Sequence, residues 1–489
     1  MAQRLNILFI SPEVEPFSKT GGLADVAGAL PKALRALGHD VRVLTPKYRG
    51  VEGKAARLKV AVPSLHVPIG DRRVEGALQE SVMAGSIPVY FLEQDHYYDR
   101  DALYTTPQGD YEDNCERFIF FCRGAVEAVR ALGWRPDVIH ANDWQSGLVP
   151  VYLRTLYRDD PFWAPCATLF TIHNLAYQGT FWHYDMPMTG LGWDLFTPAG
   201  IEFYGKINFP KGGLVFSDLL NTVSRTYAKE IQTEEFGCGL DGVLRERSEA
   251  LWGVVNGIDF EIWNPATDPE IPKRYSADDF DGKAECKAWL KEQMGLDPGQ
   301  APLVGMVTRI AEQKGLDLVL SALPGILAEG AQLVLLGSGE PPMEEAWSEA
   351  AKRYAGQVAV RIGYEGSLAR SIYAGADVFL MPSRYEPCGL GQLLSLRYGA
   401  VPVVRWTGGL ADTVVEFDKT KRSGNGFGFS ALDPEALLAA LRRALAVYRD
   451  QPLWRQLMKR GMAEDFSWEQ SAREYVTLYK KAIKQASRK

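Results

Sequence analysis

The regular alternation of short apolar runs with longer amphipathic stretches is the feature that most constrains how this 489-residue chain can fold. Short apolar runs are typical of strands buried in a parallel sheet, and amphipathic stretches between them are typical of helices that cover its faces. The pattern therefore predicts an α/β protein built on doubly wound parallel sheets. We expect strands at residues 7–11, 41–45, 89–92, 138–140, 168–172 and 219–223, and then at 303–307, 333–336, 358–362, 378–381 and 401–404.

The alternation stops between residues 256 and 299, where proline, aspartate and lysine are frequent. Such a composition indicates a connector with one exposed helix, after which the pattern resumes. The chain is also about three times as long as a typical domain of ~150 residues. We therefore expect two doubly wound domains, residues 1–256 and 257–466, and a final amphipathic helix within 467–489.

Composition excludes several classes of protein. With 46% hydrophobic and 24% charged residues, the chain is not disordered, collagen-like or a coiled coil. Its net charge of -7 argues against nucleic-acid binding, and no apolar run approaches the ~20 residues of a membrane span. The amino terminus lacks the pattern of a secretion signal, and the six cysteines form no C-x-x-C pair. We expect a reduced, cytoplasmic protein with no membrane or nucleic-acid partner.

The motif S-K-T-G-G-L-A-D at residues 18–25 follows a predicted strand and opens a predicted helix. Its paired glycines let backbone amides approach an anion at the helix N-terminus, and its lysine adds a positive charge. A tight turn with a solvated lysine is the structural alternative. The string T-G-G-L-A-D recurs at residues 407–412, again after a predicted strand. The candidate substrate-binding residues here are Lys19, Gly21, Gly22 and Asp25.

Two cations occur in T-R-I-A-E-Q-K-G, residues 308–315, after another predicted strand. Arg309 stands where the strand ends, and Lys314 stands where the next helix begins. Open α/β sheets bind ligands at the carboxyl ends of their strands, and both side chains bind phosphate oxygens. A solvated surface trio with Glu312 is the alternative, but the position favours anion binding.

The segment S-R-Y-E-P-C-G-L-G-Q, residues 383–392, places a carboxylate and several backbone amides at the end of a further strand. Glu386 is followed by the stiff Pro387 and by glycines that open a helix. This arrangement suits a sugar hydroxyl beside a diphosphate. Alternatively, Glu386 caps the helix or pairs with Arg384, but the order of strand, Glu-Pro and glycine-rich helix start favours function.

Two motifs of the first half, H-A-N-D-W at 140–144 and T-I-H-N-L-A-Y-Q-G at 171–179, also begin where predicted strands end. Asp143 beside Trp144 suits a sugar, because a carboxylate binds hydroxyls and an indole covers the ring face. His173 is one of only six histidines in the chain. We select Asp143 and His173 as candidate site residues, whereas packed core positions are the commoner fate of groups such as His140 and Trp144.

The sequence has no Cys/His cluster with the spacing of a zinc site. Asp99 and Asp101 form a D-R-D triplet that a metal-dependent transferase could use. The triplet lies in a polar, tyrosine-rich segment beyond a strand, where a surface loop is the simpler interpretation. The G-x-G-x-x-G match at residues 237–242 follows no strand, so it fails the context test for a dinucleotide-binding loop.

Together and in this order, these motifs resemble the glycogen and starch synthases that use ADP-glucose, glycosyltransferase family 5. V-V-N-G-I-D at residues 254–259 also matches, and the resemblance extends over almost the whole chain. It implies a GT-B fold, in which two Rossmann-like domains face each other across a cleft. The first domain would be the acceptor side and the second would bind the nucleotide sugar, with the last helix crossing back to the first.

The resemblance also implies an activity. The family transfers glucose from ADP-glucose to the non-reducing 4-hydroxyl of an α-1,4-glucan, such as glycogen or a maltooligosaccharide. The anomeric configuration is retained, and neither a metal nor a cofactor is needed.

The resemblance implies roles for several residues of the second domain. Arg309 and Lys314 look like the pair that neutralises the departing diphosphate, and Glu386 looks like the carboxylate that holds the donor glucose. The backbone amides beside that carboxylate belong to Cys388, Gly389 and Leu390.

In the first domain, Lys19 looks like the residue that meets the donor's phosphates. His173 and Asp143 would face the reacting sugar and the acceptor, and Asn256 would lie near the cleft.

Two positions depart from the family pattern, and three rival classes stay open. Gly391 stands where many relatives have Thr or Asn, and Leu394 leaves no second carboxylate eight residues after Glu386. The rivals are a UDP-sugar transferase, a glucan phosphorylase and a non-catalytic glucan-binding protein. A phosphorylase would need a Schiff-base lysine, and no local context marks one here.

Overall fold

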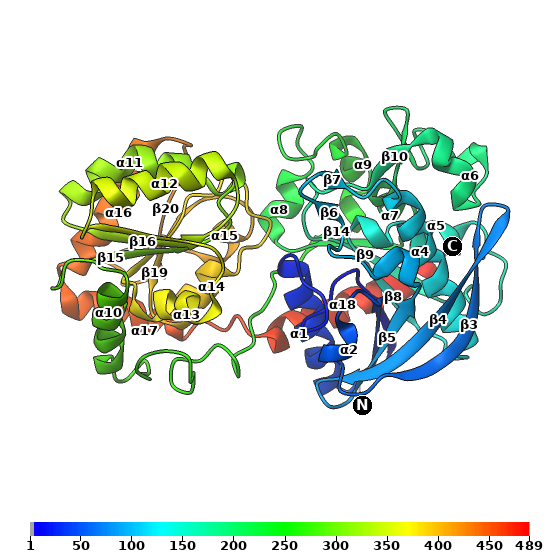
Figure 1. The fold of residues 1–489 in the computed structure, drawn as a ribbon, viewed down its shortest axis with the longest axis horizontal. Coiled ribbons are helices and arrows are strands. Elements are labelled where there is room, and N and C mark those ends of the chain that lie inside the picture. Colours follow the sequence, from blue (N-terminus) through cyan, green and yellow to red (C-terminus); the bar gives the residue numbers. More distant parts are fainter. Residues whose placement is uncertain (1–3, 489) are drawn as a thin grey trace. The chain divides into compact units, whose positions relative to one another are not determined.

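The computed structural model describes residues 4–488, which divide into two compact units (Figure 1). Unit 1 contains residues 4–256 together with 468–488, and unit 2 contains residues 257–467. The chain therefore leaves unit 1 and returns to it with its last helix. Between residues 4 and 488, none of the helices has the length and hydropathy that a membrane span requires.

A nine-stranded sheet forms the centre of unit 1, in the order β14-β13-β9-β8-β1-β2-β5-β4-β3. The first seven strands of this order are parallel, which confirms the predicted parallel sheet. The chain builds outward from β1 to β5 on one side and from β8 to β14 on the other, so its winding reverses between β1 and β8. The parallel strands are β1 (Asn6–Ile10), β2 (Asp40–Pro46), β5 (Ile87–Glu93), β8 (Val138–Asn142), β9 (Ala167–Ile172), β13 (Leu219–Thr222) and β14 (Leu251–Gly253).

An antiparallel hairpin at the edge of this sheet was not predicted. Its strands, β3 (Lys59–Ile69) and β4 (Arg72–Met83), pair with each other, and β4 also pairs with β5. Both strands are exposed at many positions and mix polar with apolar residues, so they contain no continuous apolar run. Gly70, whose φ is +61°, turns the chain between them.

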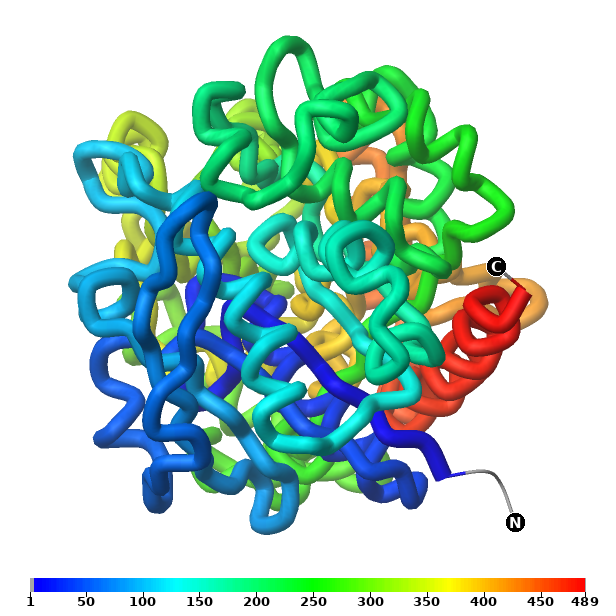
Figure 2. Tube along the Cα trace, turned by 90° about the vertical axis from the view of Figure 1, so that its right-hand side faces the viewer, coloured from blue at the N-terminus to red at the C-terminus, as the bar shows by residue number. Residues whose placement is uncertain are grey.

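The final helix, α18 (Trp468–Ala486), packs on the sheet of unit 1, beside segments from the first half of the chain (Figures 1 and 2). Tyr479 Oη lies 2.9 Å from His140 Nδ1, and Thr171 Oγ1 lies 2.7 Å from His140 Nε2. His140 is fully buried between these partners. The structural alternative is therefore confirmed for this histidine, which is a packed core residue.

The remaining elements of unit 1 connect or cover the sheet. The helices are α1 (Gly22–Ala36), α2 (Val51–Lys54), α3 (Asp95–Tyr98), α4 (Asn114–Ala131), α5 (Leu148–Arg154), α6 (Met186–Thr189), α7 (Phe209–Phe216), α8 (Arg225–Glu230) and α9 (Asp241–Glu246). Two small antiparallel sheets consist of β6 (Thr105–Thr106) and β7 (Gly109–Asp110), and of β10 (Thr180–Trp182), β12 (Lys206–Asn208) and β11 (Glu202–Phe203).

Unit 2 contains six parallel strands in the order β17-β16-β15-β18-β19-β20. Counted along the chain, this is the 3-2-1-4-5-6 order of Rossmann sheets, and the winding reverses between β15 and β18. All but the short β20 were predicted. The strands are β15 (Leu303–Val307), β16 (Gln332–Gly337), β17 (Val358–Ile362), β18 (Val378–Met381), β19 (Val401–Arg405) and β20 (Phe427–Phe429).

The helix predicted to be exposed in the connector is α10 (Asp281–Gln293), and one of its faces is buried. Cys286 and Leu290 pack in the core, and Lys287 Nζ lies 2.6 Å from Asp377 Oδ2. The prediction of exposure is wrong for this face. The other helices of unit 2 are α11 (Leu316–Ala328), α12 (Pro341–Arg353), α13 (Gly366–Gly375), α14 (Gly391–Arg397), α15 (Gly408–Thr413), α16 (Pro434–Tyr448) and α17 (Gln451–Met462).

Candidate functional site

Side chains from two of the motifs meet in unit 2, at the carboxyl ends of β15 and β18. Lys314, in the loop after β15, places its Nζ 2.6 Å from Oε2 of Glu386, in the loop after β18. Ser383 Oγ donates a hydrogen bond to the same oxygen at 2.9 Å. The two ionised side chains are only 16% and 7% exposed. Because the winding of the sheet reverses between β15 and β18, the pair lies where such sheets bind ligands.

Backbone contacts hold the loops of this pair together. Gly315 has a φ of +65°, and a Cβ at this position would lie 2.3 Å from the carbonyl oxygen of Pro382. The amide of Arg384 donates to the carbonyl oxygen of Gln313 at 2.8 Å. Only glycine combines this dihedral with such close approach, so the backbone as well as the ion pair fixes the position of Lys314.

Arg309 is joined to the same group through one glutamine. Its Nη2 donates to Gln313 Oε1 at 3.0 Å, and Gln313 Nε2 donates to the carbonyl oxygen of Tyr385 at 3.1 Å. Tyr385 directly precedes Glu386. The structure therefore connects Arg309, which is exposed, with the loop that carries Glu386.

For these two motifs, the sequence also allowed purely structural interpretations, and both of the ion-pair arrangements they suggest are wrong. Arg384 pairs with both carboxylate oxygens of Asp317, each at 2.7 Å, rather than with Glu386. Lys314 pairs with Glu386 rather than with Glu312, so no solvated trio of Glu312 with both cations forms.

The second T-G-G string holds the Glu386 turn in place. Gly408 has a φ of +45°, and a Cβ there would lie 1.9 Å from the carbonyl oxygen of Glu386. A Cβ on Gly409 would lie 2.0 Å from the carbonyl oxygen of Cys388, and the Gly409 amide donates to the Glu386 carbonyl oxygen at 3.1 Å. The turn therefore requires both glycines of this string.

The three residues selected for their amides, Cys388, Gly389 and Leu390, lie directly before α14. Gly389 has a φ of +74°. Gln392 Nε2 donates to the carbonyl oxygens of Cys388 at 3.0 Å and Gly389 at 2.9 Å. These bonds fix the path of the backbone between Glu386 and the helix.

In unit 1, a buried carboxylate that the sequence analysis missed organises the loop before α1. Glu13, which is 4% exposed, accepts hydrogen bonds from the amide and the hydroxyl of Thr20, each at 2.5 Å, and from the Gly21 amide at 3.2 Å. Tyr104 Oη donates to it at 3.1 Å. The prediction that the paired glycines offer their amides to an external anion is wrong for Gly21, because Glu13 accepts the hydrogen bond from its amide.

In the same loop, the lysine pairs with two acidic residues, and both glycines have open space at the position of a Cβ. Lys19 Nζ lies 2.6 Å from Asp25 Oδ1 and 3.7 Å from Glu15 Oε2. A Cβ at Gly21 or Gly22 would meet no atom within 4 Å, and neither residue has a positive φ. Unlike the glycines of the second string, these two are not required by packing, which favours a role in the approach of another molecule.

Asp143 and His173 follow the neighbouring strands β8 and β9 and contact each other. Asp143 Oδ1 accepts a hydrogen bond from the His173 amide at 2.7 Å. Asp143 also has a φ of +56°, a conformation that costs energy for any residue but glycine. Burial raises the pKa of Asp143 to about 7 and lowers the pKa of His173 to about 3. His173 is therefore neutral at neutral pH.

The hydrogen bonds around His173 define its tautomer. Its Nε2 lies 2.9 Å from Asn142 Oδ1, and Asn142 Nδ2 donates to the carbonyl oxygens of Ile10 and His140. Since the amide oxygen of Asn142 must accept, His173 Nε2 carries the proton. His173 Nδ1 is then an acceptor, without a hydrogen-bond donor among residues 4–488.

Trp144 is the neighbour of Asp143, and Asn256 is the candidate residue that follows β14. Their environments differ. Trp144 packs between Phe118 and Phe181, at ring distances of 4.8 and 5.8 Å, which confirms its structural alternative as a packed residue. Asn256 follows β14 and is 6% exposed, and its Oδ1 has no hydrogen-bond partner in the described part of the chain.

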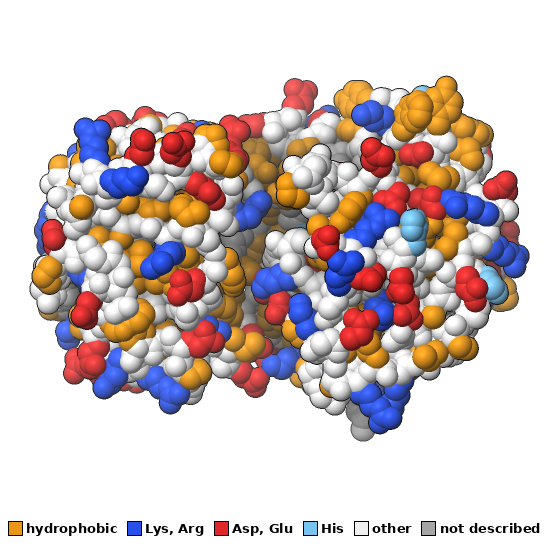
Figure 3. Space-filling view, viewed as in Figure 1, with side chains coloured by type: hydrophobic (Ala, Val, Ile, Leu, Met, Phe, Trp, Pro, Cys, Tyr) orange, Lys and Arg blue, Asp and Glu red, His pale blue; other side chains and the backbone are white. Residues whose placement is uncertain are grey.

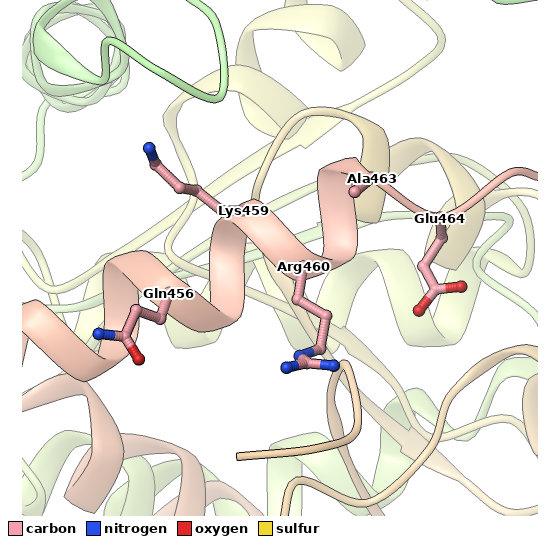
Figure 4. Close-up of a pocket in the computed structure, with 5 residues that line it drawn as sticks. All are labelled: Gln456, Lys459, Arg460, Ala463 and Glu464. Carbon is pink, nitrogen blue, oxygen red and sulfur yellow. The ribbon is translucent and has the colours of Figure 1, made fainter.

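Neither the D-R-D triplet nor the surface of α17 forms a further site. Asp99 and Asp101 both form ion pairs with Arg49, and residues 4–488 contain no group of three His, Cys, Asp or Glu side chains placed to hold a metal. A hollow on α17 is lined in part by Lys459 and Arg460, which point to opposite sides of the helix (Figure 4). Its polar groups do not converge on a ligand.

The fold and these loops define a class of protein, a GT-B glycosyltransferase built from two Rossmann-like units. Residues 6–246 match the family model described as the starch synthase catalytic domain, and residues 301–446 match that of glycosyl transferases group 1. The sucrose-phosphate synthase of Thermosynechococcus elongatus shares the fold, with a TM-score of 0.59 at 19% identity over 98% of each chain.

The chain belongs to the glycogen synthase family. It is 52% identical to the glycogen synthase of Syntrophotalea carbinolica, over 98% of this chain and 99% of the relative. It is also 52% identical to that of Anaeromyxobacter dehalogenans, over 97% and 99%. The catalytic domain of starch synthase IV from Arabidopsis thaliana, solved with ADP and acarbose, matches with a TM-score of 0.91 and 34% identity over 99% and 100% of the two chains.

Replacing Asp143 by Asn should change how stability depends on pH. Because burial raises the pKa of Asp143 from 3.8 to about 7, its contribution to stability is complete below pH 3.8 and is lost as the pH rises toward 7. Asp143→Asn keeps an acceptor for the His173 amide and has no such proton to lose. We expect the free energy of unfolding of the variant, relative to wild type, to increase between about pH 4 and pH 7 in urea denaturation.

Asp159→Asn is the matched control, because Asp159 is exposed and should show no such trend. If the difference in the free energy of unfolding between Asp143→Asn and wild type stays constant over this pH range, the raised pKa of Asp143 is contradicted.

Proposed function

We propose that this protein transfers glucose from ADP-glucose to the non-reducing 4-hydroxyl of an α-1,4-glucan, such as glycogen or a maltooligosaccharide. The anomeric configuration is retained, and neither a metal nor a cofactor takes part. Relatives named glycogen synthase and the starch synthase IV structure with ADP and acarbose support the proposal. The observation that carries it is the partly buried pair of Lys314 and Glu386 at the point where the unit 2 sheet reverses its winding.

Lys314 and Arg309 are assigned to the diphosphate of the donor. Breaking the bond between glucose and phosphate builds negative charge on the leaving oxygen, and without a metal that charge needs preorganised cations. The ammonium of Lys314 has three N–H groups, of which one contacts Glu386, so two can bind diphosphate oxygens. The guanidinium of Arg309 can bind phosphate oxygens in pairs.

Glu386 is assigned to the donor glucose. Its Oε2 accepts from Lys314 and Ser383, which leaves Oε1 as the acceptor for a sugar hydroxyl. The amides of Cys388, Gly389 and Leu390 belong to the same turn, and we assign them to the donor as well. In this proposal, unit 2 is the nucleotide-sugar domain.

Unit 1 is proposed as the acceptor-side domain, with Asp143 and His173 at the reacting sugar. Neutral His173 can accept a hydroxyl hydrogen through Nδ1 because its Nε2 proton is bound by Asn142. Lys19 and the open loop around it are assigned to the donor's phosphates. Asn256 offers a buried amide oxygen that still lacks a donor within residues 4–488.

The cytoplasm is the proposed location of the enzyme. All six cysteines are free thiols, five of them buried, and free thiols are typical of a reducing compartment.

Chain extension from radiolabelled nucleotide sugars tests this function. With maltotetraose as acceptor, we expect ADP-glucose to give longer oligosaccharides and free ADP, with new α-linkages by NMR and no loss of activity in EDTA. Faster transfer from UDP-glucose would contradict the donor preference, and a requirement for inorganic phosphate would contradict the reaction type. Loss of activity in EDTA would contradict metal independence, and binding without turnover would contradict catalysis.

Lys314→Ala should lower kcat about 10²–10³-fold, because it removes a cation from the leaving diphosphate. The rate should be measured with saturating donor, with thermal unfolding and circular dichroism to verify the fold. Lys352→Ala, at an exposed lysine of α12, is the matched control and should keep the wild-type rate. A folded Lys314→Ala enzyme with near-normal turnover would remove Lys314 from the mechanism.

A further inference from the structure

We infer that Asn142 is a positioning residue for His173, whose side-chain amide orients the imidazole and keeps positive charge away from the reacting sugar. Asn142 belongs to the H-A-N-D-W motif but was not selected from the sequence. The inference rests on the proposed function, which places His173 at that sugar. It gives a reason why the partner of the ring is an amide and not a carboxylate.

The side chain of Asn142 is fixed by three hydrogen bonds. Asn142 is the last residue of β8 and is fully buried. Its Nδ2 donates to the carbonyl oxygens of Ile10 at 3.0 Å and of His140 at 3.3 Å. Because carbonyl oxygens only accept, these two bonds determine which end of the amide is the nitrogen. The oxygen therefore points to His173, 2.9 Å from Nε2, and turning the ring would break this bond.

Two consecutive residues hold His173 at different atoms. Asp143 Oδ1 accepts from the backbone amide of His173 at 2.7 Å, whereas Asn142 Oδ1 accepts from its ring. The carboxylate is thus kept on the backbone, and the uncharged amide is placed on the ring. The opposite order would put a carboxylate on Nε2, and a carboxylate there favours the doubly protonated imidazolium. The order Asn-Asp therefore selects a neutral ring.

A neutral ring suits the charge that the proposed reaction develops. As the bond between glucose and phosphate breaks, the sugar carbon gains positive character. An imidazolium beside that carbon would repel the developing charge, and both of its nitrogens would donate hydrogen bonds instead of accepting them. A neutral ring with its proton on Nε2 avoids the repulsion and accepts a sugar hydroxyl at Nδ1. The amide of Asn142 supports both properties at once.

The titratable groups around His173 come from β8, from the loops after β1 and β8, and from α8. Burial, together with the nearby carboxylate of Glu13, raises the pKa of Asp143 to about 7. Burial lowers the pKa of His140 well below its ordinary value, so this ring is neutral as well. Tyr227 of α8 accepts through Oη from the amide two residues after His173, at 3.1 Å. Burial also lowers the pKa of His173 to about 3, which agrees with an uncharged ring at neutral pH.

Nitrogen-15 NMR of the histidine rings, without substrates, tests this role independently of catalysis. The chain has six histidines, and histidine side chains reach the surface of unit 1 in Figure 3, so His173→Gln is needed to identify the signals of the buried ring. We expect wild-type His173 to carry one proton, on Nε2, from about pH 5 to pH 8. In Asn142→Asp, the new carboxylate should raise the pKa of His173 toward 6.5, so that the ring carries two protons at the acid end of this range.

Transfer kinetics separate a positioning role from a merely structural one. The ratio of kcat/KM of Asn142→Asp to that of wild type should fall by up to about tenfold for each pH unit below the new pKa of His173, since a protonated ring cannot accept. A structural defect would lower this ratio equally at every pH. Asn6→Asp is the matched control, because Asn6 also donates to a carbonyl oxygen, that of Arg135 at 3.2 Å, but lies at the opposite end of β1. Its ratio should not depend on pH.

The outcomes separate the role of Asn142 from the proposed function. A neutral wild-type ring that becomes charged in Asn142→Asp supports this role even if no glucose transfer is found, in which case the proposed function alone fails. A wild-type His173 that carries its proton on Nδ1, or gains a second proton between pH 5 and pH 8, overturns the inference without any need for a folded variant. A folded Asn142→Asp protein with unchanged His173 signals, or with an activity ratio that does not depend on pH, also overturns it.

Discussion

The loops at the carboxyl ends of β15 and β18 meet at the partly buried ion pair between Lys314 and Glu386. Removing two ionised groups from water is costly, and apolar residues at such positions often give a more stable fold. The protein nevertheless supports this pair, since Ser383 donates to the carboxylate and two glycines, Gly315 and Gly408, let other segments of backbone approach it. Stability alone does not explain such an arrangement. The proposed transfer of glucose, which needs a fixed cation beside a fixed carboxylate, would give a reason for it.

The same six-residue string performs two different physical tasks in the two units. In unit 2, Gly408 and Gly409 pack against carbonyl oxygens of the Glu386 turn, where any side chain would collide. In unit 1, Gly21 and Gly22 have open space around them, and the loop is held instead by the carboxylate of Glu13. One copy therefore shapes a turn, and the other leaves room beside Lys19. The repeat in the sequence therefore marks two loops after strands whose glycines have different physical roles.

The sequence predicted the structure best where a physical requirement produces an unbroken run of similar residues. Buried parallel strands need apolar runs, and these predicted most strands of both sheets. The motifs around Lys314 and Glu386 were recognisable because each follows such a strand, and parallel strands bring their carboxyl ends to one edge. The β3–β4 hairpin was missed because its exposed strands mix polar and apolar residues. Glu13 was missed because its partners are mainly backbone amides and a tyrosine 91 residues away, which no spacing pattern records. The neutrality of His173 likewise follows from burial, which only the folded chain shows.

Lys314, placed by its pairing with Glu386, is proposed to bind the diphosphate of the donor. Titration calorimetry with ADP and no acceptor measures this binding without any chemistry. This role predicts that wild type and Lys352→Ala bind ADP equally well, and that Lys314→Ala binds it about tenfold or more weakly, since a charge-assisted hydrogen bond is lost. Equal ADP affinity in a folded Lys314→Ala protein would contradict it.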